Sequence, residues 1–411
     1  MTKKIAVVAT MDTKGIESDF IRGEIERLGG ETYLINIGVV GETKTQVDCT
    51  NRMVVEAAGE DFDKLLESPT RQAASPIMIK GVAKILLDKV AAGEIDAVIG
   101  LGGTQGTPNC AQIFQQLPYG FPKIILSTIA SGDTSGFMDI KDITMMPSVA
   151  DILGLNPFSR KVLSNLAGAA YGMACSDQKI ERTPDTKGVI GMTNLGVLTE
   201  GANIAVELFE NAGYEVIVFH AVGTGGRAME QMMREGLITA VFDYALGEIA
   251  DGCYECLRAA NDERLTVAAE LGLPQVICPG GAEHLGIWVN EPDHVPEEYK
   301  NHQYVFHNPY VFVPRLNSEE IKKVGETICE RLANVKGDCC FMIPEKGVCR
   351  YSVEGGPLVD RESDAVFFDA IENGLPDTVE VQRLPHGAED REFVEMAVSK
   401  LISMIEETAA V

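Results

Sequence analysis

Short apolar runs alternate along the chain with segments whose apolar residues recur at helical spacing. The run at residues 5–9 precedes an amphipathic segment at 16–28, and a second apolar run follows at 32–37. This order is typical of a buried parallel strand and its crossover helix. The pattern continues with a helical segment at 82–90 and apolar runs at 97–100 and 123–127. We therefore expect a parallel sheet with helices on both faces in the first half.

A second series of the same kind begins after the polar stretch 182–185. Its expected strands are residues 188–192, 214–219, 240–243 and 273–278, with helices at 202–209 and 229–233 between them. The sequence thus predicts an α/β protein of two Rossmann-like subdomains, residues 1–182 and 183–411, each a doubly wound and mainly parallel sheet. Local patterns also repeat: RLGGETYLINIG (27–38) is similar to ENAGYEVIVFHAVG (210–223). An internal duplication and a likeness common to any two doubly wound domains both stay open.

The charge balance limits the partners. The chain has 35 Lys and Arg against 61 Asp and Glu, a net charge of −26. Such a surface repels nucleic acids and anionic membranes, so we expect neither as a partner. There is no apolar run of the ~20 residues that a membrane span requires. The 10 cysteines are scattered, which favours reduced thiols and a cytoplasmic location.

A loop rich in glycine and threonine follows the apolar run 97–100. Its candidate ligand-binding residues are Gly102, Gly103, Thr104, Gly106 and Thr107, and a helix is expected at 109–116. Glycine lets the backbone approach a ligand, and a helix start offers free N–H groups and partial positive charge. The loop lacks the lysine of a P-loop and is not at the first βα turn, where a dinucleotide fingerprint would lie. It therefore predicts a site for an anion, most simply the phosphates of a nucleotide.

Three further loops of the first half also follow expected strands. Asp12, Thr13 and Lys14 offer a carboxylate, a hydroxyl and a cation, although Asp12 and Thr13 are equally suited to capping a helix. A third loop contains Ser131, Gly132, Asp133 and Thr134, whose polar groups can bind phosphate or ribose. Residues 145–149 are expected to form a fourth loop.

The second half places different chemistry after its strands. His220, Asp243, Glu283 and His284 are candidates for acid–base catalysis, with a structural role open for each histidine. Thr224, Gly225, Gly226 and Arg227 form a candidate second anion site, in which backbone amides stand beside a cation. A metal site that uses His220, Asp243 or His284 also stays open.

Five motifs together resemble a known family. They are ATMDTKG (9–15), GLGGTQGT (100–107), STIASGDT (127–134), MMPSVADILGLN (145–156) and PGGAEH (279–284). In this order they resemble a bacterial and fungal family related to the ATP-binding domain of the plant tobamovirus-resistance protein. The resemblance covers essentially the whole chain. It implies two Rossmann-like subdomains, a homodimer, and ATP bound in the first subdomain near 12–14, 103–107 and 131–134.

The same resemblance suggests a partner. Plant and fungal relatives often carry a fused C-terminal barrel domain that this chain lacks, so a separate protein could supply it. The sequence does not decide whether Mg²⁺ accompanies ATP.

Two functions follow from these expectations. One is an ATP-dependent enzyme acting on a small carboxylate or carbonyl compound in the cleft between the subdomains, with His220, Asp243, Glu283 and His284 as acid–base groups. The other is a non-catalytic, nucleotide-dependent binding or regulatory module. A nicotinamide dehydrogenase is disfavoured, because the first βα turn lacks the dinucleotide fingerprint.

Overall fold

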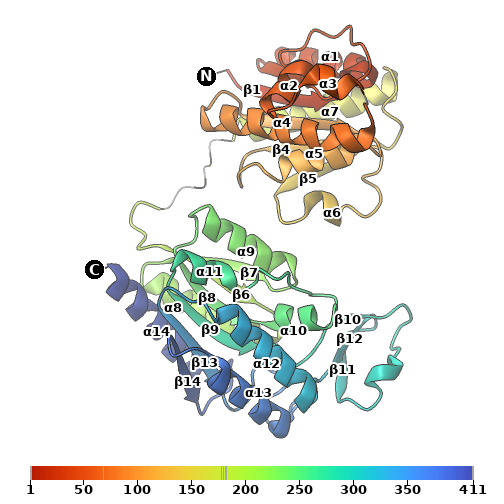
Figure 1. Cartoon of the computed structure of the whole chain (residues 1–411). Helices are drawn as coiled ribbons and strands as arrows, with labels where there is room; N and C mark the ends of the chain where they lie inside the picture. The colour runs from red at the N-terminus through yellow and green to blue at the C-terminus, as the bar shows by residue number, and fades with distance from the viewer. Residues whose placement is uncertain (1, 68, 177, 179, 181–182, 410–411) are drawn as a thin grey trace. The chain divides into compact units, whose positions relative to one another are not determined.

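The computed structural model describes residues 2–67, 69–176, 178, 180 and 183–409 (Figure 1). The chain divides into two compact units, Met1–Glu181 and Arg182–Val411. The boundary expected from the sequence, between residues 182 and 183, adjoins positions 181–182, which lie outside the described residues. None of the described helices is both long and apolar enough to cross a membrane.

The N-terminal unit is built on a parallel five-stranded sheet of order β2-β1-β3-β4-β5. Its strands are β1 (Lys4–Ala9), β2 (Glu31–Asn36), β3 (Ala97–Gly102), β4 (Lys123–Ser127) and β5 (Ile143–Pro147). Its helices are α1 (Met11–Arg27), α2 (Asn51–Ala57), α3 (Phe62–Glu67), α4 (Arg71–Ala91), α5 (Gly106–Phe114), α6 (Ser135–Met138) and α7 (Pro157–Ala174).

Strand β1 shows why this sheet needs helices on both faces. Ala6 and Val8 pack with α2, α4 and α5, whereas Ile5, Val7 and Ala9 pack with α1 and α7. Successive strand residues point to opposite faces, so a strand that is apolar throughout must be covered on both sides. The predicted doubly wound α/β fold is therefore confirmed for this unit.

The C-terminal unit has a parallel six-stranded sheet of order β14-β13-β9-β8-β6-β7. Its strands are β6 (Val189–Asn194), β7 (Glu215–His220), β8 (Ala240–Ala245), β9 (Gln275–Gly280), β13 (Cys339–Pro344) and β14 (Val379–Leu384). The helices are η1 (Gly196–Leu198), α8 (Thr199–Asn211), α9 (Thr224–Arg234), α10 (Gly247–Cys253), α11 (Thr266–Leu271), η2 (Glu297–Tyr299), α12 (Ser318–Leu332), α13 (Arg361–Gly374) and α14 (Arg391–Ala409). The first strand of each unit lies between the second and the third, so the two sheets share this topology.

A small antiparallel sheet is appended to the C-terminal unit (Figure 1). It consists of β10 (Ile287–Trp288), β11 (Tyr304–Asn308) and β12 (Val311–Pro314) in the order β10-β12-β11. The prediction of a loop over residues 145–149 is partly wrong. Met145–Pro147 belong to β5, which is an edge strand, and only the residues after them form a turn.

The turn from β3 into α5 predicts a sharp effect of one substitution. A Cβ atom added at Gly102 would lie 2.2 Å from the backbone nitrogen of Thr107, because the helix starts directly against the strand end. We expect Gly102→Ala to lower the free energy of unfolding by about 1–3 kcal/mol, as overpacking against rigid backbone does. Gly23→Ala in α1 is the control, since its Cβ meets no atom within 4 Å, and it should raise stability by about 0.4–1 kcal/mol. Urea denaturation measures both, and equal stability of Gly102→Ala and wild type would contradict this turn geometry.

Candidate functional site

A pocket of about 340 Å³ lies at the carboxyl edge of the N-terminal sheet. It is lined by residues that follow β1, β2 and β3, among them Thr10, Gly38 and Gly106. The chain runs from β1 outward to β2 and returns to β3 on the other side of β1. Loops diverge at such a point, and doubly wound proteins bind their ligands there.

Three helices begin at this pocket. Asp12 and Thr13 belong to the first turn of α1, Arg71 opens α4 and Gly106 opens α5. The first-turn N–H groups of a helix carry partial positive charge, so three helix starts at one cavity favour an anion. Arg71 adds a full charge and forms no ion pair with any residue that the structure describes. Arg71 was not predicted, because the helical pattern was recognised only over 82–90 and so did not place this residue at a helix start.

The other predicted residues of this region have different positions. Gly102 ends β3, Gly103 and Thr104 lie in the turn before α5, and none of the three is among the described residues that line the pocket. Thr107 is fully buried, and its hydroxyl shares a 2.7 Å hydrogen bond with that of Ser127. These residues shape the turn rather than face the cavity.

Lys14 and the loop at 131–134 also lie outside the pocket lining. Lys14 donates a hydrogen bond to the carbonyl oxygen of Ile152, so its ammonium group already has an internal acceptor. Ser131 and Gly132 are exposed, and the Asp133 carboxylate accepts hydrogen bonds from the backbone and hydroxyl of Ser135 at the start of α6, just after Thr134. The structure therefore brings Asp12, Thr13 and Gly106 together and leaves these residues apart.

A second pocket, of about 480 Å³, lies within the C-terminal unit. His220 at the end of β7 and His284 after β9 both line it, together with Arg258 and with His307 from β11. Tyr351 contributes its ring, which lies edge-on to the His284 ring at 5.9 Å. The remaining lining is mainly aliphatic: Leu195, Val197, Val222, Leu257, Leu285, Val311 and Val313. A largely apolar cavity with a few convergent polar groups is the usual form of a small-molecule site.

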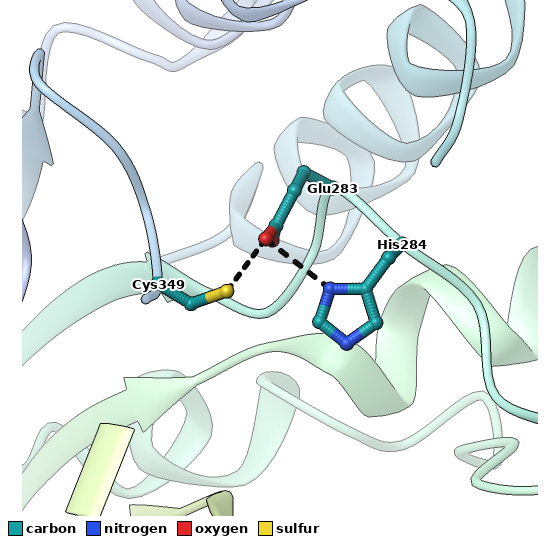
Figure 2. Close-up of side chains that lie close together, drawn as sticks. All are labelled: Glu283, His284 and Cys349. Carbon is teal, nitrogen blue, oxygen red and sulfur yellow. Dashed lines mark hydrogen bonds and ion pairs between the residues drawn. The ribbon is translucent and has the colours of Figure 1, made fainter. Parts of the chain in front are cut away.

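Behind His284 lies a buried chain of polar groups (Figure 2). The Cys349 thiol donates to Oε1 of Glu283 across 2.7 Å, and the same oxygen lies 3.2 Å from Nδ1 of His284. Burial raises the pKa of Glu283, but the neighbouring His284 and Arg315 outweigh it and hold the pKa at about 2. Burial and the Glu283 charge hold the pKa of Cys349 well above its usual range. Glu283 is thus a carboxylate, and Cys349 is a thiol donor rather than a nucleophile.

The contact made by the opposite ring nitrogen of His284, Nε2, decides between a role as a general base and a role as a metal ligand. Nε2 lies 3.4 Å from Nη1 of Arg258, which can only donate, so Nε2 accepts and the proton of a neutral ring is on Nδ1. Nδ1 lies 3.2 Å from Oε1 of Glu283, within ion-pair distance but without a hydrogen bond, so the nearby carboxylate favours this tautomer by its charge. Glu283, His284 and Cys349 are close enough to bind a metal ion, but a metal on Nδ1 would put an N–H on Nε2 facing the Arg258 donor. The arrangement therefore favours a general base whose Nε2 lies at the pocket.

Asp243 takes no part in this pocket. It is buried, and its carboxylate receives Nη1 and Nη2 of Arg264 at 2.5 and 2.6 Å and the hydroxyl of Thr193 at 2.7 Å. A buried carboxylate held by a bidentate arginine and a hydroxyl already has strong partners, and Asp243 is not among the described residues that line the pocket. The expected catalytic role of Asp243 is therefore replaced by a structural one.

The predicted second anion site is filled by a carboxylate of the protein itself. Oε1 of the fully buried Glu248 accepts hydrogen bonds from the amides of Gly223 and Gly226, at 2.6 and 3.0 Å. Thr224, Gly225, Gly226 and Arg227 do form the start of α9, as expected for an anion site. The anion that this helix start binds is a side chain of the protein itself. The prediction that this loop binds a ligand is therefore wrong.

Comparison with known proteins identifies the family. The N-terminal domain of the Uncharacterised protein family (UPF0261) matches residues 3–179, and the C-terminal domain of that family matches residues 187–405. The chain belongs to the UPF0261 family. A UPF0261 protein of Clostridium tetani is 38% identical over 410 residues, which cover 99% of this chain and 100% of that protein.

The expected relationship to the plant tobamovirus-resistance protein is supported as a similarity of sequence. The ToMV resistance protein Tm-1(GCR237) of Solanum lycopersicum is 32% identical over 339 residues, 81% of this chain and 45% of that protein. Among solved structures, Acinetobacter baumannii MurG covers 99% of this chain and 98% of its own, at 12% identity and a TM-score of 0.22. A likeness this weak carries no argument about the function of a UPF0261 protein.

The carboxylates around Arg264 predict a pH dependence of stability. Burial raises the pKa of Glu230 from 4.5 to about 7, despite the nearby Arg264. An acid with a raised pKa in the folded state contributes stability that is fully present below pH 4.5 and is lost as the pH rises through about 7. We expect Glu230→Gln to remove this loss, which is on the order of 2–3 kcal/mol at pH 8. Denaturant unfolding at pH 5 and pH 8 tests it, with Glu207→Gln as the control, because Glu207 is an exposed residue of α8. A mutant with the wild-type pH dependence would contradict the assignment.

Proposed function

We propose that the N-terminal unit of this UPF0261 protein binds ATP. The observation that carries the proposal is the meeting of three helix starts, of α1, α4 and α5, at one cavity at the carboxyl edge of the sheet, beyond β1, β2 and β3. Such a cavity favours a polyanion, and the resemblance of the loop motifs to an ATP-binding family narrows the polyanion to ATP. Gly106 and Arg71 are the groups best placed for phosphates.

A neighbouring cavity has room for the rest of a nucleotide. It measures about 580 Å³ and shares Arg71, Ser75, Gln105 and Asn109 with the pocket at the helix starts. Pro76 and Ile79 supply apolar surface there, and Gln112 and Gln116 supply amides. Apolar contacts with a few amide groups suit a purine base. If Mg²⁺ accompanies the triphosphate, Asp12 and Thr13 are the oxygen donors that would hold it.

We further propose that the C-terminal pocket is the active site of an ATP-dependent enzyme for a small carboxylate or carbonyl compound. His284 is the proposed general base, Glu283 its orienting residue and His220 a second acid–base group that lines the same pocket. Asp243 is not part of this proposal. The homodimer and the separate barrel-domain partner implied by the family resemblance stay predictions.

A non-catalytic, nucleotide-dependent module is the alternative. The observation that favours it is the internal use of Asp243 and of the Gly223 and Gly226 amides, which removes one of the four expected acid–base residues and the expected second anion site. In that case the C-terminal pocket binds an effector that is not transformed.

Removal of the pocket cation should weaken nucleotide binding. We expect Arg71→Ala to raise the ATP dissociation constant about tenfold or more, because a charge-assisted contact with phosphate is lost. Lys84→Ala is the matched control, since Lys84 is exposed on the same helix and does not line the pocket. Isothermal titration calorimetry measures both variants. Unchanged affinity in Arg71→Ala would exclude this pocket, and binding of NADH in place of ATP would overturn the choice of nucleotide.

A measurement of ADP release distinguishes the proposed ATP-dependent enzyme from the non-catalytic module. Purified protein with ATP, magnesium and a panel of small carboxylates and carbonyl compounds should release ADP, measured by a coupled assay. We expect His284→Asn to reduce this rate by about 10²-fold or more, as loss of a general base does, while ATP binding is unchanged. Tight ATP binding without ADP release for any compound would instead support the module.

A further inference from the structure

The C-terminal pocket differs in charge from the protein around it. The chain has a net charge of −26, yet among the described residues those that line this pocket include one arginine, three histidines and no aspartate or glutamate. An acidic protein repels anions over most of its surface, so a cavity whose basic side chains have no acidic counterpart in the lining favours a negatively charged ligand. The aliphatic lining then favours an apolar body attached to the charge.

We propose that this pocket binds a small monocarboxylate with a branched apolar tail, that Arg258 holds its carboxylate, and that this contact frees Nε2 of His284 from Arg258. The proposal rests on the enzymatic function proposed above and names its substrate class. Arg258 is an anchoring residue in it, and the sequence analysis did not single this residue out.

The local contacts leave Arg258 ready for a ligand. Its Nε donates to Oδ2 of Asp251 at 3.0 Å, and Nη2 donates to Oδ1 of Asp251 at 2.8 Å and to the carbonyl of His284 at 2.9 Å. Asp251 is itself fully buried and also accepts from the amide of Gly286. The guanidinium plane is therefore rigidly oriented. Nη1 carries two hydrogens, of which one is used by the long contact to His284 and the other has no acceptor among the described residues.

Because Arg258 contacts Nε2 of His284, the ability of His284 to accept a proton depends on whether a ligand is bound. At 3.4 Å the bond from Nη1 to Nε2 is long and weak, whereas a carboxylate would accept a short charge-assisted bond from the same nitrogen. A bound carboxylate that accepts both Nη1 hydrogens, the spare one and the one that faces His284, takes the donor from Nε2, while Glu283 stays close to Nδ1. The imidazole is then available to accept a proton only when an acid occupies the pocket.

Isocaproate is a suitable probe, with isocaproamide as its neutral isostere. Calorimetric titration of the full chain, without ATP, should show isocaproate binding and isocaproamide binding about tenfold weaker or worse. On binding of the acid, the imidazole ¹⁵N resonances of His284 should shift, and they are assigned by their absence in His284→Asn. Equal binding of acid and amide, or binding of neither, would overturn the proposal.

Two variants test the role of Arg258 itself. Arg258→Lys keeps the charge but loses the fork geometry, whereas Arg258→Met combined with Asp251→Leu removes the buried pair together and avoids an unpaired carboxylate. Both should lose the preference for the acid over the amide, with folding checked by circular dichroism. Arg331→Met is the control, because Arg331 is a partly buried arginine of α12 that does not line the pocket. An acid preference retained in both Arg258 variants refutes the assignment, whereas failure of ATP binding leaves this titration unaffected.

Discussion

The C-terminal unit depends on one fully buried arginine. Arg264 forms ion pairs with Asp243 of β8 and Glu248 of α10, and it lies 3.9 Å from Glu230 of α9. Removing such charges from water is expensive, and it is repaid only where each group has close partners. The cluster meets this requirement by joining three consecutive elements, α9, β8 and α10, through one arginine. Glu248 also binds the amides at the start of α9, so the arginine fixes the loops at the carboxyl edge of the sheet.

The same constraint divides the polar residues of this edge into two groups. Asp243, Glu248 and Arg264 satisfy one another inside the protein, and they set where the loops lie. Arg258, His284 and Glu283 are equally buried, but their chain of contacts ends at a cavity. A precise binding site requires side chains that are held in place by a rigid surrounding structure. Here the cluster around Arg264 holds the backbone from which Arg258, His284 and Glu283 project.

The sequence predicted four strands of each parallel sheet, because continuous apolar strands such as 5–9 and helical periodicity such as that of 16–28 are strong local signals. It did not predict β13, β14 or the small antiparallel sheet. It predicted Glu283 and His284 at the site, since both follow a strand directly. It could not predict that Glu248, from another segment, fills the amides of α9, because that contact depends on tertiary packing. Arg258 and Cys349 were missed for a related reason, since their neighbours in the chain carry no recognisable motif. Met145 and Met146 were taken for a loop because their strand lies at the sheet edge and is short.

The appended sheet of β10, β11 and β12 has a consequence for how such a protein diversifies. It supplies His307, Val311 and Val313 to the wall of the C-terminal pocket, while Glu283, His284 and Arg258 come from segments outside its strands. Changes in this excursion can therefore remodel the cavity wall and leave the reactive groups in place. If the pocket binds a small molecule as proposed, sequence changes in this three-stranded sheet would alter which ligand fits while the polar groups stay on the main framework.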